Sequence, residues 1–334
     1  MVKAKKWILA TEFAGEPKDS NFKLEEENLP ALKDGEIICD AVYLSVDPYM
    51  RLDRDWINSV GSVIIGEQVA RVTESKSKDY PVGCLVQMYS GWRSRTLVNP
   101  ANKTATEAIH FLKVPDLGKL EPSLALGILG MPGMTAYFGF LELCQPKAGD
   151  TVLVNGAAGA VGSAVGQIAK IKGCKVIGFA GSKEKCDWVK SLGFDHVFNY
   201  KEQDIDKSLK EAAPDGIDCY FDNVGGNFTS KALQHMKEFG RISVCGGISV
   251  YNATQPPLTP DPFMTILSQQ LKVEGFIVMR WWTRFPEGKA EMKKWIDEGK
   301  LKYRETVQDG FDNMPKIFMS LLKGANIGKM IVKA

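Results

Sequence analysis

Apolar and polar positions follow two different patterns along the chain. Up to about residue 122, short alternating or β-branched runs are separated by turn residues, which predicts strands of an irregular, partly closed β-domain. From about 123 to 299, apolar strands alternate with amphipathic helices, which predicts a parallel, doubly wound α/β sheet. After residue 300, a strand, a helix and a final strand are expected to rejoin the first domain. The strand-like runs of the first part are 2–10, 35–46, 66–75 and 83–98.

Individual elements follow from the same pattern. A helix is expected within 122–143, and the segments 251–263 and 283–288 are expected to be loops. Gly173 and Gly193 follow two predicted helices, where a left-handed residue commonly ends a helix. Strands are predicted at 151–155, 175–180, 196–200, 216–225, 241–247, 271–278, 302–307 and 329–334. Further helices are predicted at 161–172, 183–192, 205–212, 229–237 and 314–323.

Composition narrows the class of protein. With 334 residues, 44% of them hydrophobic, the chain is long enough for two cores. Its 42 basic and 40 acidic side chains are interspersed, which argues against a nucleic-acid groove or a membrane-binding face and favours a small-molecule partner. The start lacks the apolar region of a signal peptide, and charges interrupt every hydrophobic run. We therefore expect a cytoplasmic protein.

The cysteines and histidines give no sign of a metal centre. The seven cysteines are scattered and odd in number, which indicates reduced thiols rather than a disulfide framework. No pair has CxxC spacing, and the chain has only His110, His196 and His235. A tetrahedral zinc site therefore lacks a cluster of ligands, and we expect none.

The strongest motif is a glycine-rich turn between a predicted strand and a predicted helix. Gly156, Gly159 and Gly162 follow the run TVLVN. Glycine allows the tight turn and lets main chain approach a pyrophosphate, while the helix N-terminus attracts its charge. The spacing GxxGxxG alone is weak evidence, but the strand before it and the helix after it favour a dinucleotide site over an ordinary turn.

The next strand favours a phosphorylated dinucleotide. NAD sites carry an acidic residue about 20 positions after the glycines, but residues 176–181 contain none. Instead, Ser182, Lys183 and Lys185 begin a helix, where cations are unfavourable unless an anion is bound. These residues are therefore candidates for the 2′-phosphate of NADPH. The alternative is two solvated lysines beside an ordinary serine N-cap.

More polar residues stand at the predicted carboxyl ends of strands, the edge where open α/β sheets bind ligands. They are Tyr200, Asn223 and Cys245–Gly247. Each alone fits a turn as well as a site, but their joint placement favours a site.

Six segments carry a family resemblance that covers nearly the whole chain. They are 45–51, 131–139, 157–163, 219–226, 239–249 and 324–334. Through them the chain resembles the medium-chain dehydrogenase/reductase superfamily, and within it the leukotriene and alkenal double-bond reductases. This resemblance implies a GroES-like catalytic domain (1–122 and 300–334), a Rossmann NADP-binding domain (123–299) and a homodimer. Where zinc-containing members carry GHE, this chain has Gly66-Glu67-Gln68.

The resemblance also implies which parts of the chain hold NADPH. They are the glycine turn, the residues at its 2′-phosphate, Asn223, the loop 245–251, the segment 276–282 and the tail. The implied cofactor residues are Gly159, Ala160, Val161, Gly162, Lys185, Tyr200, Asn223, Cys245, Gly246, Gly247, Ile248, Ser249, Val250, Tyr251, Phe276, Ile277, Val278, Met279, Arg280, Trp281, Trp282 and Asn326.

The reaction that this resemblance implies is hydride delivery to the β-carbon of an α,β-unsaturated ketone or aldehyde, such as an oxo-prostaglandin, another oxo-eicosanoid or an alkenal. The resulting enolate needs a hydrogen-bond donor. Tyr251 is the preferred catalytic donor; the cofactor ribose hydroxyl is the alternative, with Tyr251 orienting substrate or forming pocket wall, and Tyr49 is a weaker candidate. Arg54, Arg280 and Arg284 are weak candidates for binding a lipid carboxylate.

Three alternatives stay open. Oxidation of the 12-hydroxyl of leukotriene B4, a second activity that the resemblance implies, ranks below alkene reduction, because no histidine stands in a recognisable proton relay. A quinone or carbonyl oxidoreductase would share the fold and the glycine turn. A crystallin-like protein that binds NADPH without turnover is the third.

Overall fold

The computed structural model describes residues 2–52, 58–101, 111–115, 117–255 and 257–334. The chain forms two compact units. The first, called here the β unit, comprises Met1–Leu126, Glu305–Asn326 and Met330–Ala334. The second, the α/β unit, comprises Gly127–Arg304 and Ile327–Lys329.

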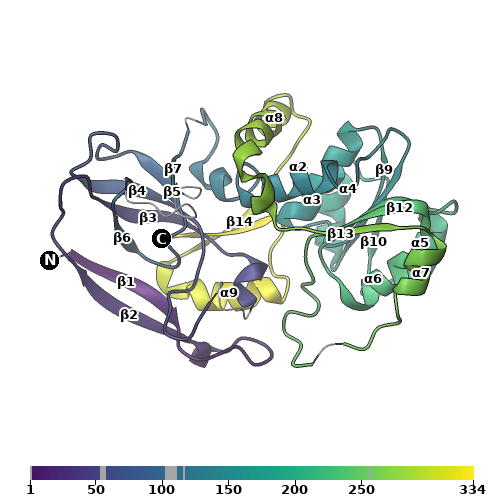
Figure 1. The fold of residues 1–334 in the computed structure, drawn as a ribbon, viewed down its shortest axis with the longest axis horizontal. Coiled ribbons are helices and arrows are strands. Elements are labelled where there is room, and N and C mark those ends of the chain that lie inside the picture. Colours follow the sequence, from purple (N-terminus) through teal and green to yellow (C-terminus); the bar gives the residue numbers. More distant parts are fainter. Residues whose placement is uncertain (1, 53–57, 102–110, 116, 256) are drawn as a thin grey trace. The chain divides into compact units, whose positions relative to one another are not determined.

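The β unit is built from antiparallel strands (Figure 1). One sheet pairs β1 with β2, and the other has the order β14-β15-β3-β4-β5-β7, with β6 also on β3. The strands are β1 (Val2–Leu9), β2 (Phe22–Leu29), β3 (Ile37–Ser45), β4 (Gln68–Ser75), β5 (Leu85–Met88), β6 (Arg95–Val98), β7 (Leu112–Lys113), β14 (Glu305–Asp309) and β15 (Lys329–Lys333).

Strand β2 was not predicted, because its three consecutive glutamates resemble a polar loop. In the structure Glu25 and Glu26 lie opposite Lys6 and Lys5 of β1, and Lys6 Nζ is 2.7 Å from Glu27 Oε2. The apolar ends of β2, Phe22 and Leu29, are buried. Cross-strand charge pairing therefore stabilises a strand that lacks an alternating pattern.

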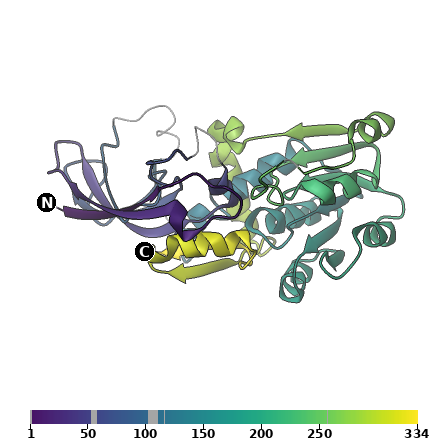
Figure 2. The ribbon, with the colours of Figure 1, turned by 90° about the horizontal axis from the view of Figure 1, so that it is seen from below.

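The C-terminal tail completes the β unit, as the sequence predicts. Strand β15 pairs antiparallel with β3, and α9 (Met314–Leu322) packs beside β1 and β2, in yellow and purple in Figure 2. Phe318 of α9 is buried, with its ring 6.4 Å from Phe13, 6.2 Å from Phe22 and 5.8 Å from Trp92. Three short 3-10 helices lie at Asp19–Asn21, Pro48–Arg51 and Phe311–Asn313.

The α/β unit contains a six-stranded parallel sheet with the order β10-β9-β8-β11-β12-β13. This order confirms the predicted doubly wound fold, and its topological switch point lies between β8 and β11. The strands are β8 (Thr151–Val154), β9 (Lys175–Ala180), β10 (His196–Asn199), β11 (Ile217–Asp222), β12 (Met236–Val244) and β13 (Lys272–Gly275).

The first four helices of the α/β unit agree with the sequence pattern, whereas those at Phe263–Ser268 and Phe285–Asp297 were not predicted. Gly173 and Gly193 follow α3 and α4 with φ of 79° and 86°, as predicted. The helices are α2 (Met131–Leu141), α3 (Ala160–Ile171), α4 (Lys183–Ser191), α5 (Ile205–Ala212), α6 (Gly226–Leu233), α7 (Phe263–Ser268) and α8 (Phe285–Asp297). One 3-10 helix of this unit lies at Val278–Arg284, and another, Pro122–Leu126, ends the first segment of the β unit.

Two element predictions were wrong. Helix α6 begins at Gly226 and ends at Leu233, so residues 236–237 belong to β12 rather than to the predicted helix 229–237. The segment after the tryptophan pair is not a loop but continues into α8, where Met292 and Trp295 are buried at helical spacing.

No helix in the described part of the chain combines the length and the apolar character that a membrane crossing requires.

Candidate cofactor and active site

The glycine turn joins the buried strand β8 to helix α3. Gly156 adopts φ +57°, which favours glycine. A Cβ on Gly162 would lie 2.4 Å from the main-chain oxygen of Gly156, so only glycine lets the helix start against the turn. Gly159 caps the helix without a side-chain hydrogen bond. The first N–H groups of α3 are therefore suited to bind an anion.

A tail segment that sequence reasoning missed holds this turn from the side. Gly328 donates its N–H to the main-chain oxygen of Ala158 at 2.7 Å and forms a parallel bridge with Gly159. It has φ +68°, and a Cβ there would lie 1.8 Å from the oxygen of Arg304. The half-buried Asn326 stands just before this segment in the sequence. The glycine-containing tail motif GANIGK (324–329) was the sequence feature that could have indicated this contact.

The residues predicted to bind the 2′-phosphate are only partly arranged as expected. Ser182 caps α4, its Oγ accepting from Lys185 N at 3.3 Å. Lys183 is instead directed to Asp187, with Nζ 2.6 Å from Oδ2 and its side chain 85% exposed. Lys185 is half-buried, and desolvation together with the nearby Lys201 lowers its pKa. The sequence motif gave no reason to distinguish the two lysines, but in the structure they differ in exposure and in the charged groups around them.

Tyr200 and Lys201 complete this group from the end of β10. A Cβ on Gly181 would lie 2.8 Å from the hydroxyl of Tyr200, so glycine makes room for the phenol beside the start of α4. Lys201 was missed by sequence reasoning, although its position directly after Tyr200 was a signal. The positive charge of Lys201 is near enough to contribute to the lowered pKa of Lys185, so two cationic side chains approach one another here.

Asn223 and the loop 245–251 lie together at the carboxyl ends of β11 and β12. Asn223 donates its main-chain N–H to Asn155 Oδ1 at 2.7 Å and its Nδ2 to the main-chain oxygen of Asn155 at 2.9 Å. The N–H groups of Cys245 and Gly246 donate to the main-chain oxygen of Asp222. The sequence-predicted residues of these two strand ends are therefore brought together beside the glycine turn.

The hydroxyl of Tyr251 is placed over this loop. It accepts a hydrogen bond from Gly247 N at 3.3 Å, and a Cβ on Gly246 would lie 2.9 Å from it. Burial raises the pKa of Tyr251, so the phenol keeps its proton and retains it for donation. Burial and Asp222 also raise the pKa of Cys245, to about 12, which makes this thiol a poor nucleophile.

The segment 276–282 divides into core and exposed positions. Phe276 packs so closely on Gly139 that a Cβ there would lie 2.2 Å from its ring. Trp281 is buried and stacks on Phe138 with ring centroids 5.8 Å apart. Ile277 and Trp282, in contrast, are 63% and 46% exposed. Packing therefore fixes this segment while leaving Ile277 and Trp282 open to solvent.

Two of the arginines considered for binding a lipid carboxylate form ion pairs with carboxylates of the protein itself. Arg280 Nη1 lies 2.8 Å from Glu274 Oε1, and Arg284 lies 2.7 Å from Glu142 and 2.9 Å from Glu287. These pairs do not support either as the partner of a lipid carboxylate. Arg54 lies outside the described residues.

In the β unit, the motif Gly66-Glu67-Gln68 is held by side-chain hydrogen bonds. Glu67 is 8% exposed, and its Oε1 accepts from Gln87 Nε2 at 3.3 Å. Gln68 Nε2 donates to the main-chain oxygen of Gly91 at 3.1 Å. Burial raises the pKa of the weaker candidate Tyr49 well above its ordinary value. Among the described residues, no group of three or more His, Cys, Asp or Glu side chains is arranged to hold a metal ion.

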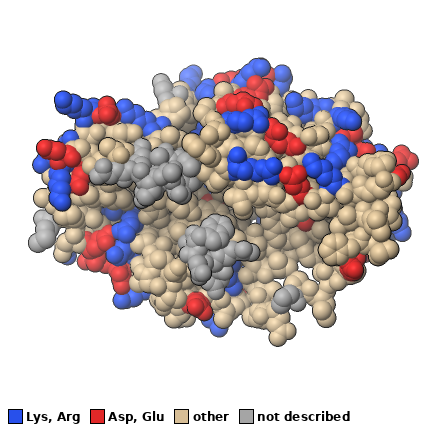
Figure 3. All heavy atoms as spheres, viewed as in Figure 1, with Lys and Arg blue, Asp and Glu red and all other residues tan. Residues whose placement is uncertain are grey.

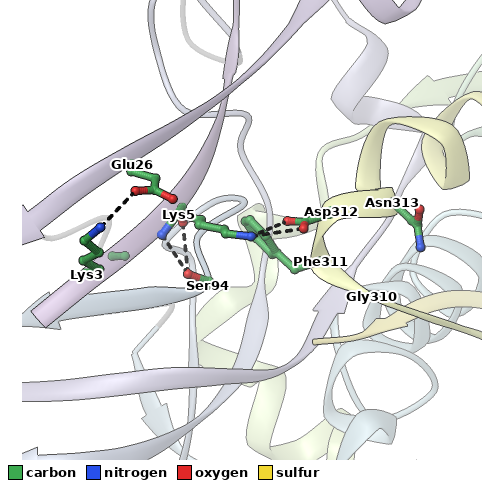
Figure 4. Close-up of a pocket in the computed structure, with 9 residues that line it drawn as sticks. Lys3, Lys5, Glu26, Ser94, Gly310, Phe311, Asp312 and Asn313 are labelled. Atoms are coloured by element: carbon green, nitrogen blue, oxygen red, sulfur yellow. Dashed lines mark hydrogen bonds and ion pairs between the residues drawn. The ribbon is translucent and has the colours of Figure 1, made fainter.

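A hollow of about 650 Å³ on the β unit contains none of the predicted site residues (Figure 4). Lys5 and Asp312 form an ion pair of 3.1 Å beside it, and Lys3 and Glu26 form one of 3.7 Å. These charged groups thus neutralise one another, and we assign no binding or catalytic role to this hollow.

Comparison with known proteins assigns the family. The family described as zinc-binding dehydrogenase matches residues 160–294, and that described as N-terminal domain of oxidoreductase matches 5–106. The chain is 41% identical to the 2-alkenal reductase (NADP(+)-dependent) of Nicotiana tabacum, over 99% of this chain and 97% of that protein. The structure of CurA from Vibrio vulnificus in complex with NADPH is similar, with a TM-score of 0.91, 39% identity and 99% of each chain covered.

A still higher identity is found with prostaglandin reductase 1 of Oryctolagus cuniculus: 52%, over 98% of this chain and 93% of that protein. The chain therefore belongs to the family of prostaglandin reductase 1, within the medium-chain dehydrogenase/reductase superfamily of oxidoreductases.

Proposed function

We propose that this protein uses NADPH to reduce the carbon–carbon double bond of α,β-unsaturated ketones and aldehydes. The group formed by Ser182, Lys185, Tyr200 and Lys201, beside the glycine turn, carries the proposal, because it suits a dinucleotide with an additional phosphate. The tobacco relative is named for NADP-dependent reduction of 2-alkenals, which are substrates of this chemical class.

The residues present fit NADPH from one end to the other. The N–H groups at the start of α3, after Gly159, are suited to the pyrophosphate, and Lys185 with Tyr200 is suited to the 2′-phosphate. Asn223 and the loop 245–251 are assigned to the nicotinamide end. When bound, NADPH supplies a hydride to the β-carbon of the substrate.

Tyr251 is assigned as the donor that stabilises the negative charge on the substrate oxygen. Its hydroxyl accepts from Gly247 and so directs its own proton elsewhere, and its raised pKa keeps that proton in place. A fixed donor in a site with little water stabilises a developing enolate more than water does, because it needs no reorientation. No metal ion takes part in this proposed chemistry.

The test compares two substrate classes. Purified protein is incubated with NADPH and either an enone or a quinone, NADPH consumption is followed by absorbance, and products are identified by mass spectrometry. We expect the enone to gain two hydrogens across its double bond. Consumption with the quinone alone would refute alkene reduction, and binding of NADPH without turnover on either class would favour a non-catalytic protein.

Oxidation of a lipid alcohol is not favoured by the histidines that the structure describes. His235 Nε2 lies 3.1 Å from Asp206 Oδ1, and the ring of His196 stacks on that of Phe198. His110 lies outside the described residues. Neither described histidine contacts the residues assigned to the cofactor's nicotinamide end, so neither is placed to take the proton of a substrate hydroxyl there.

A homodimer through the β13 side of the α/β unit is also part of the proposal. Strand β13 ends the sheet order, and Val273 within it is 42% exposed. Phe263, Met264 and Leu267 of the adjoining α7 are each at least 66% exposed, and the surface around α7 in Figure 3 carries few charges. A second copy related by two-fold symmetry would pair the strand edges and cover these apolar side chains.

The finer assignments of the domains and the compartment are proposals too. We assign residues 1–122 and 300–334 to a GroES-like catalytic domain and 123–299 to the NADP-binding domain. The seven cysteines, none of which forms a disulfide, support a place in the reducing cytoplasm.

A further inference from the structure

The carboxylate of Asp222 lies at the carboxyl end of β11, beside the topological switch point, and is only 2% exposed. A carboxylate at this depth requires hydrogen bonds to its oxygens. We infer that Asp222 is a positioning residue for the nicotinamide end of the cofactor, acting through the turn 222–225 and the loop 245–251. This inference rests on the proposed NADPH-dependent function.

Four donors converge on the side chain of Asp222. Its Oδ1 accepts from Asn155 Nδ2 at 2.8 Å and from the main-chain N–H groups of Val224 and Gly225 at 3.0 and 2.9 Å. Its Oδ2 accepts from Thr229 Oγ1 at 2.5 Å. Hydrogen bonds to a charged acceptor are stronger than those between neutral groups, so one carboxylate sets the shape of this turn.

The turn 222–225 supports, in turn, the loop 245–251 that follows β12. Successive N–H groups of the loop donate to successive main-chain oxygens of the turn, so any change in the turn moves the loop that carries Tyr251. These bonds are Cys245 N to Asp222 O at 2.9 Å, Gly246 N to Asp222 O at 3.1 Å, Ile248 N to Asn223 O at 3.3 Å and Ser249 N to Val224 O at 3.1 Å.

Asn155 links the same carboxylate to the glycine turn. Its Nδ2 donates to Asp222, while its Oδ1 accepts from Asn223 N and its main-chain oxygen accepts from Asn223 Nδ2. Asn155 directly precedes Gly156. The carboxylate therefore fixes Asn223 between the part of the site assigned to the pyrophosphate and the part assigned to the nicotinamide.

The substitution Asp222→Asn tests the inference. It keeps the shape but removes the charge that the four donors share, and its NH₂ group can face only Thr229 Oγ1, whose hydroxyl would then have to accept rather than donate. We expect the Kd for NADPH, measured by fluorescence titration, to rise about tenfold or more. The rise in Tm that NADPH produces should shrink accordingly, and KM for NADPH should rise by a larger factor than kcat falls.

Asp218→Asn is the matched control on the same strand. Asp218 Oδ2 accepts from Thr151 N at 2.8 Å and from Lys237 Nζ at 2.9 Å, at the other end of β11, about 13 Å along the strand. Its loss removes a partly buried carboxylate without touching the turn 222–225. We expect this variant to bind NADPH like the wild-type protein, even where its Tm in the absence of cofactor is lower.

A folded Asp222→Asn variant with wild-type NADPH affinity and only a lower Tm would overturn the inference. If that variant does not fold, Thr229→Val replaces it, because it removes one donor from Oδ2 and keeps the side-chain shape. Its Kd should rise about threefold, and an unchanged Kd would equally overturn the inference. Failure of the wild-type protein to bind NADPH would instead refute the proposed function, so the two failures are distinguishable.

Discussion

Lys183 and Lys185 stand two positions apart in one helical turn, yet their surroundings differ. The exposed Lys183 is neutralised by Asp187, whereas Lys185 is half-buried and faces the charge of Lys201. The lowered pKa of Lys185 means that burial beside Lys201 carries an energetic cost for its ammonium form. A bound phosphate dianion removes the cost, because it stabilises the charged form.

We predict that Lys185→Ala weakens NADPH binding by about 1 to 3 kcal/mol and leaves NADH binding nearly unchanged, because only NADPH carries the 2′-phosphate. Titration calorimetry or fluorescence with both cofactors measures the difference. Lys183→Ala is the matched control and should leave both affinities unchanged. An equal loss for both cofactors in Lys185→Ala would contradict the assignment of this lysine.

Tyr251→Phe should lower kcat about a hundredfold and change the Kd for NADPH little, because it removes the proposed enolate donor and keeps the ring. Stopped-flow measurement of hydride transfer with a saturating enone gives the rate. Unchanged turnover would leave Tyr251 with a packing role and assign the donor to the cofactor ribose.

At the scale of elements, the site depends on how β8, α3 and the tail segment 327–329 meet. The turn can be tight only because Gly162 has no side chain against the oxygen of Gly156. The tail adds a main-chain hydrogen bond to Ala158 from the outside of the turn. The position of the N–H groups assigned to the pyrophosphate is therefore set by main chain on both sides.

Gly162→Ala should destabilise the protein by about 1 to 3 kcal/mol, because the added Cβ meets main chain that cannot rotate away. It should also weaken NADPH and NADH by similar factors, since both carry the pyrophosphate. Denaturant unfolding and paired cofactor titrations measure the two effects. A variant that discriminates between the cofactors as Lys185→Ala does would show that the turn does not hold the pyrophosphate.

At the scale of the whole molecule, the β13 side of the α/β unit combines a strand edge with exposed apolar side chains. Strand edges of this kind promote pairing with another chain, and exposed apolar patches mark interaction surfaces. In this protein both features lie on one unit, next to one another in the chain.

Light scattering of the wild-type protein should therefore give twice the mass of one chain. Replacing Val273 with lysine and Leu267 with glutamate should produce monomers, because the charges would be buried in the dimer. Val82→Glu is the control, since Val82 is 64% exposed but lies in the β unit. A dimer that persists in the double variant would place the contact elsewhere.

By itself, the sequence determined the alternation of strands and helices, the glycine turn and the absence of an acidic residue from 176–181, where β9 ends. These features depend on local periodicity and on the conformational freedom of glycine, both of which act within a few residues. The division into a β-rich part with a returning tail and a parallel α/β part followed from the same pattern, and the observed sheets confirm this fold class.

Only the tertiary structure decided which lysine of the pair faces Lys201, that β2 is a strand, that residues 327–329 hold the glycine turn and that Asp222 organises three strand ends. Each of these depends on groups far apart in the sequence: Glu27 meets Lys6, Gly328 meets Ala158, and Asp222 meets Asn155. Burial and hydrogen-bond partners are properties of such contacts, and local periodicity does not contain them.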